Sequence, residues 1–497
     1  MTIRTEILSL MTVAAALAAQ GQTSTPSATA TVNADAPKLS PLEQSIQDIK
    51  NPTPWLSWGA DLRLRNEYYN NDRTLKQDKA NHEQDYFRIR PRLWTSITPI
   101  KDLSLNARIT TEMRDYVDPS DSSAFNLNKN PAWSSSTKGY YGYDWAYGII
   151  DTLNIKYKNI ADSGATLTVG RQDMMLNEGW LTGDGTPLDG STTAYLDAAR
   201  LTYDFKEQHT TVDAIGLLQY ARPDAWLPTI NEQHRAVADQ NEKGGILNIN
   251  NTTIKEANVG AYFIYKNDKR LTINPPLGAN GDNADIYTTG ARVNGVCADH
   301  WKYSVEGAYQ FGQRRDPVLT DAFLANTYRD ISAFGVNSKL SYLFNDSMKN
   351  TVGLAYEFLS GDNKNTKNDE MFDVLWGRYA RWTDLYTYVY VKENRHIGAY
   401  NNYHRFGPTW TLTPVNKLDV SLTYNVLWAD QTTPTRNSDN AAFAGGSFRG
   451  QYIQSLFRYK FNQHVAALLQ GEAFVPGNFY ASNKLISFIR AELSFTF

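Results

Sequence analysis

The chain has 497 residues, with 49 basic and 52 acidic side chains and a single cysteine, Cys297. The formal charge of -3 at pH 7 gives no basic surface for nucleic acid, and one thiol supports neither a disulfide nor a cysteine-based metal site. No apolar run approaches the roughly 18 residues of a membrane-spanning helix, so a helical membrane protein is excluded.

Residues 1–19 have the pattern of a secretory signal peptide. Arg4 precedes an apolar stretch over residues 7–17, and Ala16-Leu17-Ala18 has the small-x-small form of a cleavage site. Residues 20–54 are expected to follow as a periplasmic tether. Within it, Ser40, Pro41 and Glu43 combine an N-cap, a proline at the first helical position and a capping glutamate. This pattern predicts a short helix over residues 40–50, which acts either as a plug or as a spacer.

From residue 55 to residue 497, apolar and polar side chains alternate with a period of two. In residues 86–94, Phe87 and Ile89 share one face and Arg88 and Arg90 share the other. Such segments run about ten to thirteen residues, which matches a tilted strand that crosses a bilayer. Short turns alternate with long Gly- and Asn-rich connections, as is typical of outer-membrane barrels. The predicted fold class is therefore all-β, a transmembrane antiparallel β-barrel in the bacterial outer membrane.

The strand count follows from the up-and-down order of the segments. About seventeen strands are recognised directly, but a single-chain bacterial barrel has an even number. The missing strand is predicted at residues 245–250, which gives about eighteen. The chain ends in a strand with Leu493, Phe495 and Phe497 on one face, which looks like the signal that the barrel-assembly machinery recognises. That machinery, through Phe497, and outer-membrane lipid are the expected partners.

A barrel of this size encloses an aqueous lumen. A basic side chain that faces lipid near the midplane costs about 2–4 kcal/mol, so alternation directs the strand arginines inward. The predicted substrate path is lined by Arg63, Arg65, Arg88, Arg90, Arg92, Arg108, Arg200, Arg405, Arg458, Lys460 and Arg490. Inward acids, among them Glu112, Glu306, Glu357, Glu472 and Glu492, leave a second interpretation open, in which these arginines form structural ion pairs. Arg171 is ambiguous, because strict alternation directs it outward, whereas a bulge or a position at the rim would re-aim it.

Aromatic residues near strand ends are interpreted as girdle residues at the lipid–water interfaces. They are Tyr68, Tyr69, Trp94, Trp145, Trp180 and Trp428.

Several motifs resemble those of the alginate export family. They are Arg63-Leu64-Arg65 with Glu67, Gly170-Arg171-Gln172, residues 306–312 (EGAYQFG), residues 356–363 (YEFLSGDN) and residues 471–480 (GEAFVPGNFY). The resemblance implies an eighteen-stranded channel, in a family whose members pass the anionic polysaccharide alginate to the cell exterior. The chain departs from the family pattern at residues 176–181 and at Leu196-Asp197-Ala198, where the family usually has Phe-Asp-Gly. The resemblance therefore supports the channel class more than the substrate.

The function expected from the sequence is passive passage of an anionic polysaccharide or oligosaccharide through an arginine-lined lumen. A general or small-anion porin is the alternative, and a surface receptor or adhesin is a further one. An enzyme is not expected, because His209, His300 and His464 fall in predicted periplasmic turns and the other histidines accompany no nucleophile motif. Neither a cofactor nor a metal is expected.

Overall fold

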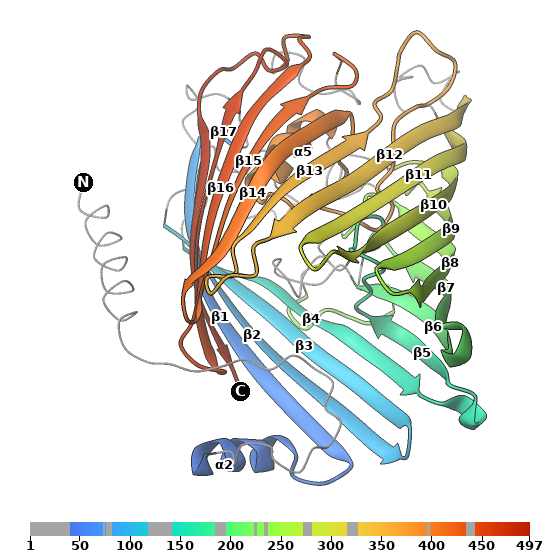
Figure 1. Cartoon of the computed structure of the whole chain (residues 1–497), viewed down its shortest axis with the longest axis vertical. Helices are drawn as coiled ribbons and strands as arrows, with labels where there is room; N and C mark the ends of the chain where they lie inside the picture. Colours follow the sequence, from blue (N-terminus) through green and yellow to red (C-terminus); the bar gives the residue numbers. More distant parts are fainter. Residues whose placement is uncertain are drawn as a thin grey trace.

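The computed structural model describes residues 40–72, 75, 82–117, 142–183, 195–222, 226–232, 237–271, 281–315, 327–394, 398–433 and 443–497. The expected signal peptide and residues 20–39 of the tether lie outside these ranges. Eighteen strands form one closed antiparallel sheet, so the predicted barrel and its strand number are confirmed (Figure 1). The strands are β1 (Leu56–Asn70), β2 (Glu83–Ile100), β3 (Leu103–Tyr116), β4 (Gly142–Tyr157), β5 (Ala165–Gln172), β6 (Leu196–Phe205), β7 (Thr210–Gln219), β8 (Asn241–Ile254), β9 (Ala257–Lys269), β10 (Ala284–Cys297), β11 (Trp301–Arg315), β12 (Tyr328–Leu343), β13 (Thr351–Leu359), β14 (Tyr403–Val415), β15 (Leu418–Trp428), β16 (Phe448–Lys460), β17 (Val465–Pro476) and β18 (Ile486–Thr496).

The first and last strands close the barrel. β1 pairs with β2 on one side and with β18 on the other, in a register that places Arg65 opposite both Arg88 and Glu492. β8 contains the strand predicted at residues 245–250 and pairs with β7 and β9. A closed sheet leaves no strand edge unpaired within the bilayer, which is the condition for crossing it with strands.

Alternation along each strand separates a lipid face from an inner face. On β2, Phe87 is 47% exposed and Leu93 is 49% exposed, whereas Arg88 and Arg90 between them are buried. Apolar side chains thus cover the outer surface, because hydrocarbon surrounds it, and polar side chains gather inside.

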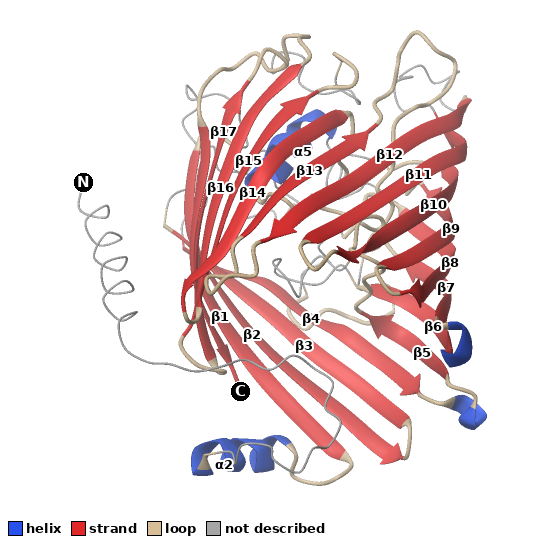
Figure 2. Cartoon of the chain, in the orientation of Figure 1, coloured by secondary structure: helices blue, strands red, loops and turns tan. Residues whose placement is uncertain are grey.

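The hydrophobic core lies inside the barrel. The connection from β13 to β14 folds into the lumen over residues 360–394 and 398–402, and it carries helix α5 (Leu385–Asn394) (Figure 2). We call these residues the in-lumen segment. Phe372, Trp376, Leu385 and Tyr386 of this segment are almost fully buried. The inside of the barrel is therefore packed as well as polar.

Helix α2 (Pro41–Lys50) lies beside the start of β1, at the end of the barrel that carries the short turns (Figure 1). We assign this end to the periplasm because periplasmic turns are short. Ser40 caps α2 by accepting a hydrogen bond of 3.2 Å from the Glu43 backbone N–H, as its sequence position predicted. The 3-10 turns η1 (Ile160–Asp162) and η2 (Lys206–Gln208) lie between strands at the same end. Among the described residues, no helix is both long enough and apolar enough to cross a membrane.

Three girdle predictions are wrong. Tyr69 is 1% exposed and Trp180 is 3% exposed, and both belong to the interior core. Trp94 pairs with Gly59 and shares the inward parity of Arg90 and Arg92, so its ring lies against Gly59 inside the barrel. Girdle residues must face lipid, and neither an inward position nor an infolded connection provides that face.

Candidate transport pathway

The inner faces of β1, β2 and β3 carry a row of arginines, which we call the arginine ladder. Its members are Arg63, Arg65, Arg88, Arg90, Arg92 and Arg108. They form the row because β1 and β2 place arginine at alternate positions, and pairing brings Arg63 opposite Arg90 and Arg65 opposite Arg88. Like charges at such short range need carboxylates between them.

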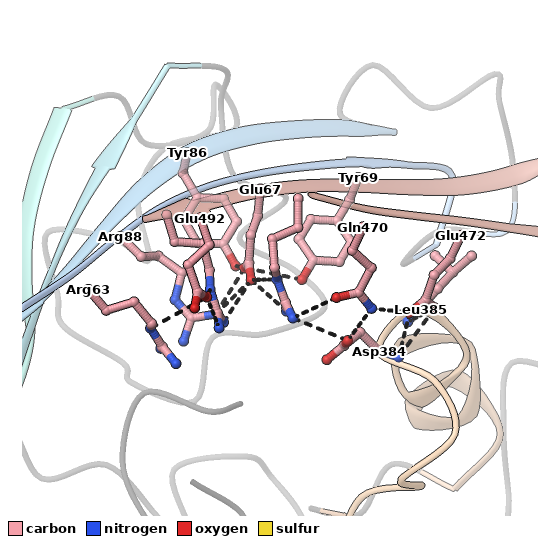
Figure 3. Close-up of polar contacts among 12 residues, drawn as sticks. Arg63, Glu67, Tyr69, Tyr86, Arg88, Asp384, Leu385, Gln470, Glu472 and Glu492 are labelled. Carbon is pink, nitrogen blue, oxygen red and sulfur yellow. Dashed lines mark hydrogen bonds and ion pairs between the residues drawn. The ribbon is translucent and has the colours of Figure 1, made fainter. Parts of the chain in front are cut away.

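Glu67 is the centre of the resulting network. Its carboxylate lies 3.2 Å from Arg65, 2.9 Å from Arg88 and 2.7 Å from Arg490, and it accepts a hydrogen bond of 2.9 Å from the Tyr86 hydroxyl (Figure 3). One buried carboxylate therefore neutralises charge from three strands, β1, β2 and β18.

Further carboxylates extend the network in both directions. Glu112 lies 3.0 Å from Arg88 and 2.9 Å from Arg114, and Arg63 lies 3.9 Å from both Glu112 and Glu492. In the described part of the chain, the ion pairs join seven arginines to five carboxylates: Arg63, Arg65, Arg88, Arg90, Arg92, Arg114 and Arg490 to Asp61, Glu67, Glu112, Asp384 and Glu492. At the inward positions of β18 and β1 to β3, arginines outnumber carboxylates.

Arg108, the ladder member on β3, lies 2.8 Å from both Asp151 and Asp173. Two predicted arginines on other strands also have acidic partners: Arg200 lies 2.8 Å from Asp213, and Arg405 lies 3.3 Å from Glu357. Arg458 and Lys460 are exposed near the periplasmic end of β16. Most of the predicted set thus takes part in ion pairs, as the second interpretation of the sequence expected.

Arg171 is not part of the ladder. It pairs opposite Leu153, an outward residue, so it keeps the outward parity that strict alternation predicted, although Gly170 before it has a φ of 120°. Asp197 accepts a hydrogen bond of 2.9 Å from Arg171, and the Tyr195 ring lies 4.1 Å away. These contacts keep the charge away from lipid.

The in-lumen segment spans the barrel between opposite walls. Near its middle, the indole N–H of Trp376 donates a hydrogen bond of 3.0 Å to Glu242 on β8. Arg378 forms an ion pair with the same carboxylate at 2.5 Å. On the far side, Asp384 lies 3.2 Å from Arg490 on β18. The segment therefore narrows any path through the lumen, and it contacts the arginine wall directly.

Helix α5 is attached at both ends. The Glu472 carboxylate on β17 accepts hydrogen bonds from the backbone N–H groups of Asp384 at 3.1 Å and Leu385 at 2.8 Å, which are helix N-terminal donors without an internal partner (Figure 3). At the other end, Arg449 on β16 forms a two-pronged pair with Glu393 at 2.7 and 2.9 Å. Charge-assisted bonds at both termini hold the helix against the wall.

A second connection folds inward after β5. The ring of Trp180 stacks on that of Phe372, with 5.7 Å between the ring centroids, and its indole N–H donates a hydrogen bond of 3.1 Å to Glu357. In the same stretch, Glu178 lies 2.7 Å from Lys339; burial opposes ionisation of Glu178, but the hydrogen bond and charge of Lys339 outweigh it and lower the pKa of Glu178. Two infolded connections thus share the lumen.

Sequence reasoning missed both infolded connections. The signal was present, because residues 371–376 and 385–390 are rich in apolar and aromatic side chains within a supposed extracellular loop. A long connection that stayed in water would expose them.

Comparisons with known proteins agree with this architecture. A family model described as "Alginate export" matches residues 54–487. Among solved structures, the chain is similar to OccAB1 of Acinetobacter baumannii, at 11% identity and a TM-score of 0.55, over 89% of this chain and 96% of that one. It is also similar to OccK8 (OprE) of Pseudomonas aeruginosa, at 12% identity and a TM-score of 0.53, over 88% and 98% of the two chains. A BenF-like porin from Pseudomonas fluorescens Pf-5 matches at 10% identity and a TM-score of 0.53, over 88% and 98%. At these identities the likeness shows the barrel fold. No curated protein matches the sequence.

Proposed function

The chain belongs to the alginate export family and forms a channel in the bacterial outer membrane, and from this premise we propose that it passes an anionic polysaccharide or oligosaccharide by diffusion along the arginine ladder. The observation that carries the proposal is the excess of arginines over carboxylates on the wall formed by β18 and β1 to β3. In a pore with low-dielectric walls, such an excess attracts anions.

Arginine suits this task chemically. Its planar guanidinium stays charged and donates two parallel hydrogen bonds to a carboxylate, which is the group repeated along an anionic polysaccharide. Glu67, Glu112 and Glu492 hold the arginines in place. A substrate carboxylate then competes with these fixed partners for the guanidinium groups, so that it binds weakly and leaves again. No step in this process breaks a covalent bond.

A small-anion porin is the second candidate. The in-lumen segment favours it, because a narrowed path admits small solutes more readily than a polymer. The receptor or adhesin alternative requires a lumen without ion flow.

Single-channel recording of the purified chain in planar bilayers separates these candidates. We expect an ion current that is anion-selective and that short uronate oligomers interrupt. Unchanged current at high oligomer concentration would favour the small-anion porin, and the absence of current would favour a receptor or adhesin.

The role of the ladder is tested by replacing Arg65, Arg90 and Arg108 together with Ser. We expect the chloride-over-potassium permeability ratio to fall several-fold. The control replaces Lys158, Lys206 and Lys349 with Ser, which removes the same formal charge from exposed periplasmic turns. Equal ratios in the two variants would assign the ladder a structural role only.

A further inference from the structure

Helix α2 lies on the lipid side of the barrel rim, beside the seam between β1 and β18. The indole N–H of Trp58 donates a hydrogen bond of 2.8 Å to the Ile49 carbonyl of α2. The ring of Trp58 also packs on that of Phe497, with 5.2 Å between the ring centroids. Both rings have the outward parity of their strands. Glu43 of α2 also lies 3.0 Å from His464, in the turn between β16 and β17. The helix is therefore attached to the outer surface of the barrel at its periplasmic end.

The side chains of α2 divide into three sectors. With about 100° per residue, the half-buried side that faces the barrel is formed by Glu43, Ile46, Gln47 and Lys50. Leu42 and Ile49 form a neighbouring apolar sector and are 69% and 52% exposed. The polar Gln44 and Asp48 lie opposite the apolar sector and bond to each other at 2.9 Å.

This division matches a helix that lies in a membrane interface, with protein beside it, lipid above and water below. Trp55, which follows the helix and is 51% exposed, is a residue type enriched at that level. The apolar sector continues the lipid-facing surface of the barrel through Trp58. We propose that α2 is an interfacial helix whose Leu42 and Ile49 insert into the periplasmic leaflet of the outer membrane.

Spin labels test this placement in the full chain reconstituted in phospholipid vesicles. In a Cys297→Ser background, labels are placed at Leu42→Cys and Ile49→Cys, with Gln44→Cys as the matched control on the water side. We expect oxygen, which partitions into lipid, to increase the relaxation rate of the spin labels at positions 42 and 49 more than a water-soluble nickel complex does. At position 44 we expect the nickel complex to have the larger effect. Greater nickel access at all three positions would overturn the proposal. Shielding from both reagents that depends on protein concentration would instead indicate contact with a second copy and overturn it too.

A separate observation concerns Tyr379 in the in-lumen segment. Its side chain is 43% exposed although it lies inside the barrel, whereas Arg378 and Ala380 on either side are buried. Its φ of 68° is left-handed, which is unfavourable for a bulky residue and is commonly held in place at functional sites. Arg378 is fixed by Glu242, so this backbone turn presents Tyr379 to the open lumen.

Other tyrosines line the same space. Tyr147 on β4 and Tyr388 on α5 are partly exposed, and both lie near Tyr379. Arg114 of the charged wall lies 5.6 Å from the Tyr147 ring. Ring faces beside arginines suit a molecule that carries both apolar C–H faces and carboxylates. Resting on the proposed function, we infer that Tyr379 is a specificity residue that stacks on pyranose rings of the passing saccharide.

The residence time of oligosaccharides in single-channel recordings tests this role, with a uronate hexamer and the neutral maltohexaose as probes. We expect Tyr379→Ala to shorten both residence times about three- to tenfold and Tyr379→Phe to keep them within about twofold, because the ring and not the hydroxyl makes the contact. Tyr328→Ala, at an exposed tyrosine on the extracellular end of β12, should keep the wild-type times.

Unchanged times in Tyr379→Ala, or an equal loss in Tyr379→Phe, would overturn the stacking role. This result is distinguishable from failure of the proposed function. If the proposed function fails, the triple arginine variant keeps the wild-type ion selectivity, while the maltohexaose residence time still depends on Tyr379.

Discussion

Glu67 links three strands through buried charge. It contacts Arg65, Arg88 and Arg490, and its side chain is inaccessible to solvent. Such a cluster is a weak source of net stability, because desolvation offsets the attraction. Removal of the carboxylate is different, since three guanidinium groups then lose a shared counter-charge.

We expect Glu67→Ala to destabilise the barrel by about 3 kcal/mol, the usual cost of breaking a buried ion pair. The temperature at which the compact, unheated gel form converts to the unfolded form should fall. The same variant should raise the preference for chloride, because one negative charge leaves the wall. Glu207→Ala, in an exposed periplasmic turn, is the control. A conversion temperature equal in the two variants would contradict a central role for Glu67.

Asp362 provides a pH-dependent contact at the start of the in-lumen segment. Burial raises its pKa, but hydrogen bonds from Arg329 at 2.9 and 2.8 Å and from Lys364 at 2.6 Å outweigh burial, so the pKa lies below its ordinary value. A lowered folded-state pKa means that the stabilisation is complete above the unfolded value of about 3.9 and is lost as the pH falls through the folded value.

We therefore expect Asp362→Asn to increase current noise from the in-lumen segment at pH 7. The difference from the wild type should shrink as the pH falls through the lowered pKa of Asp362, because the wild-type carboxylate is then itself protonated. Recordings of both proteins at pH 7 and at successively lower pH measure this. Equal noise in the two proteins at pH 7 would show that the ion pair does not hold the segment.

At the scale of elements, α5 is held by contacts at its ends more than by its own sequence. A helix of ten residues is marginal in isolation, and its apolar side chains are distributed around the axis. Glu472 at the N-terminus and Arg449 at the C-terminus supply the complementary charges. The position of the in-lumen segment should therefore depend on these two wall residues.

Glu472→Ala should loosen the N-terminus of α5, where a lost cap costs about 1–2 kcal/mol. We expect a higher or noisier single-channel conductance and faster proteolysis within residues 360–402. Asp213→Ala removes another buried inward carboxylate that bonds Arg200 and Asn248 instead of the segment, and it serves as the matched control. Identical proteolysis in both variants would place the attachment elsewhere.

At the scale of the whole molecule, the barrel is completed only when β18 meets β1. Their register runs from Asp61 opposite Thr496 to Asn70 opposite Ser487. The Phe497 backbone N–H donates a hydrogen bond of 2.8 Å to the Ala60 carbonyl. β18 thus closes the barrel, and recognition of Phe497 beside it by the assembly machinery stays a prediction from the sequence.

Phe497→Ser should reduce the amount of folded protein in the outer membrane several-fold, whereas Phe497→Trp should retain most of it. The measurement is the fraction of heat-modifiable protein in outer-membrane preparations, with Phe461→Ser at a periplasmic turn as control. Equal amounts in Phe497→Ser and the control would exclude a role for the terminal ring in assembly.

Much of this architecture follows from the sequence alone. A period of two with arginine on one parity determines which face of β1 to β3 meets lipid, because the free-energy cost of a charge in hydrocarbon does not depend on distant contacts. The up-and-down order of the segments, together with the even strand number of single-chain bacterial barrels, gives the eighteenth strand. Local motifs, such as Gly170-Arg171-Gln172, also indicate the family to which the chain belongs.

The tertiary structure decided what occupies the lumen. Which carboxylate each arginine meets depends on strand register and on closure, as Arg490 reaches Glu67 only because β18 pairs with β1. The in-lumen segment lies inside the barrel because Glu242, Glu472 and Arg449 bind it, and these partners are far apart in the chain. Pairing between such residues has no periodic signature, so local pattern could not predict it.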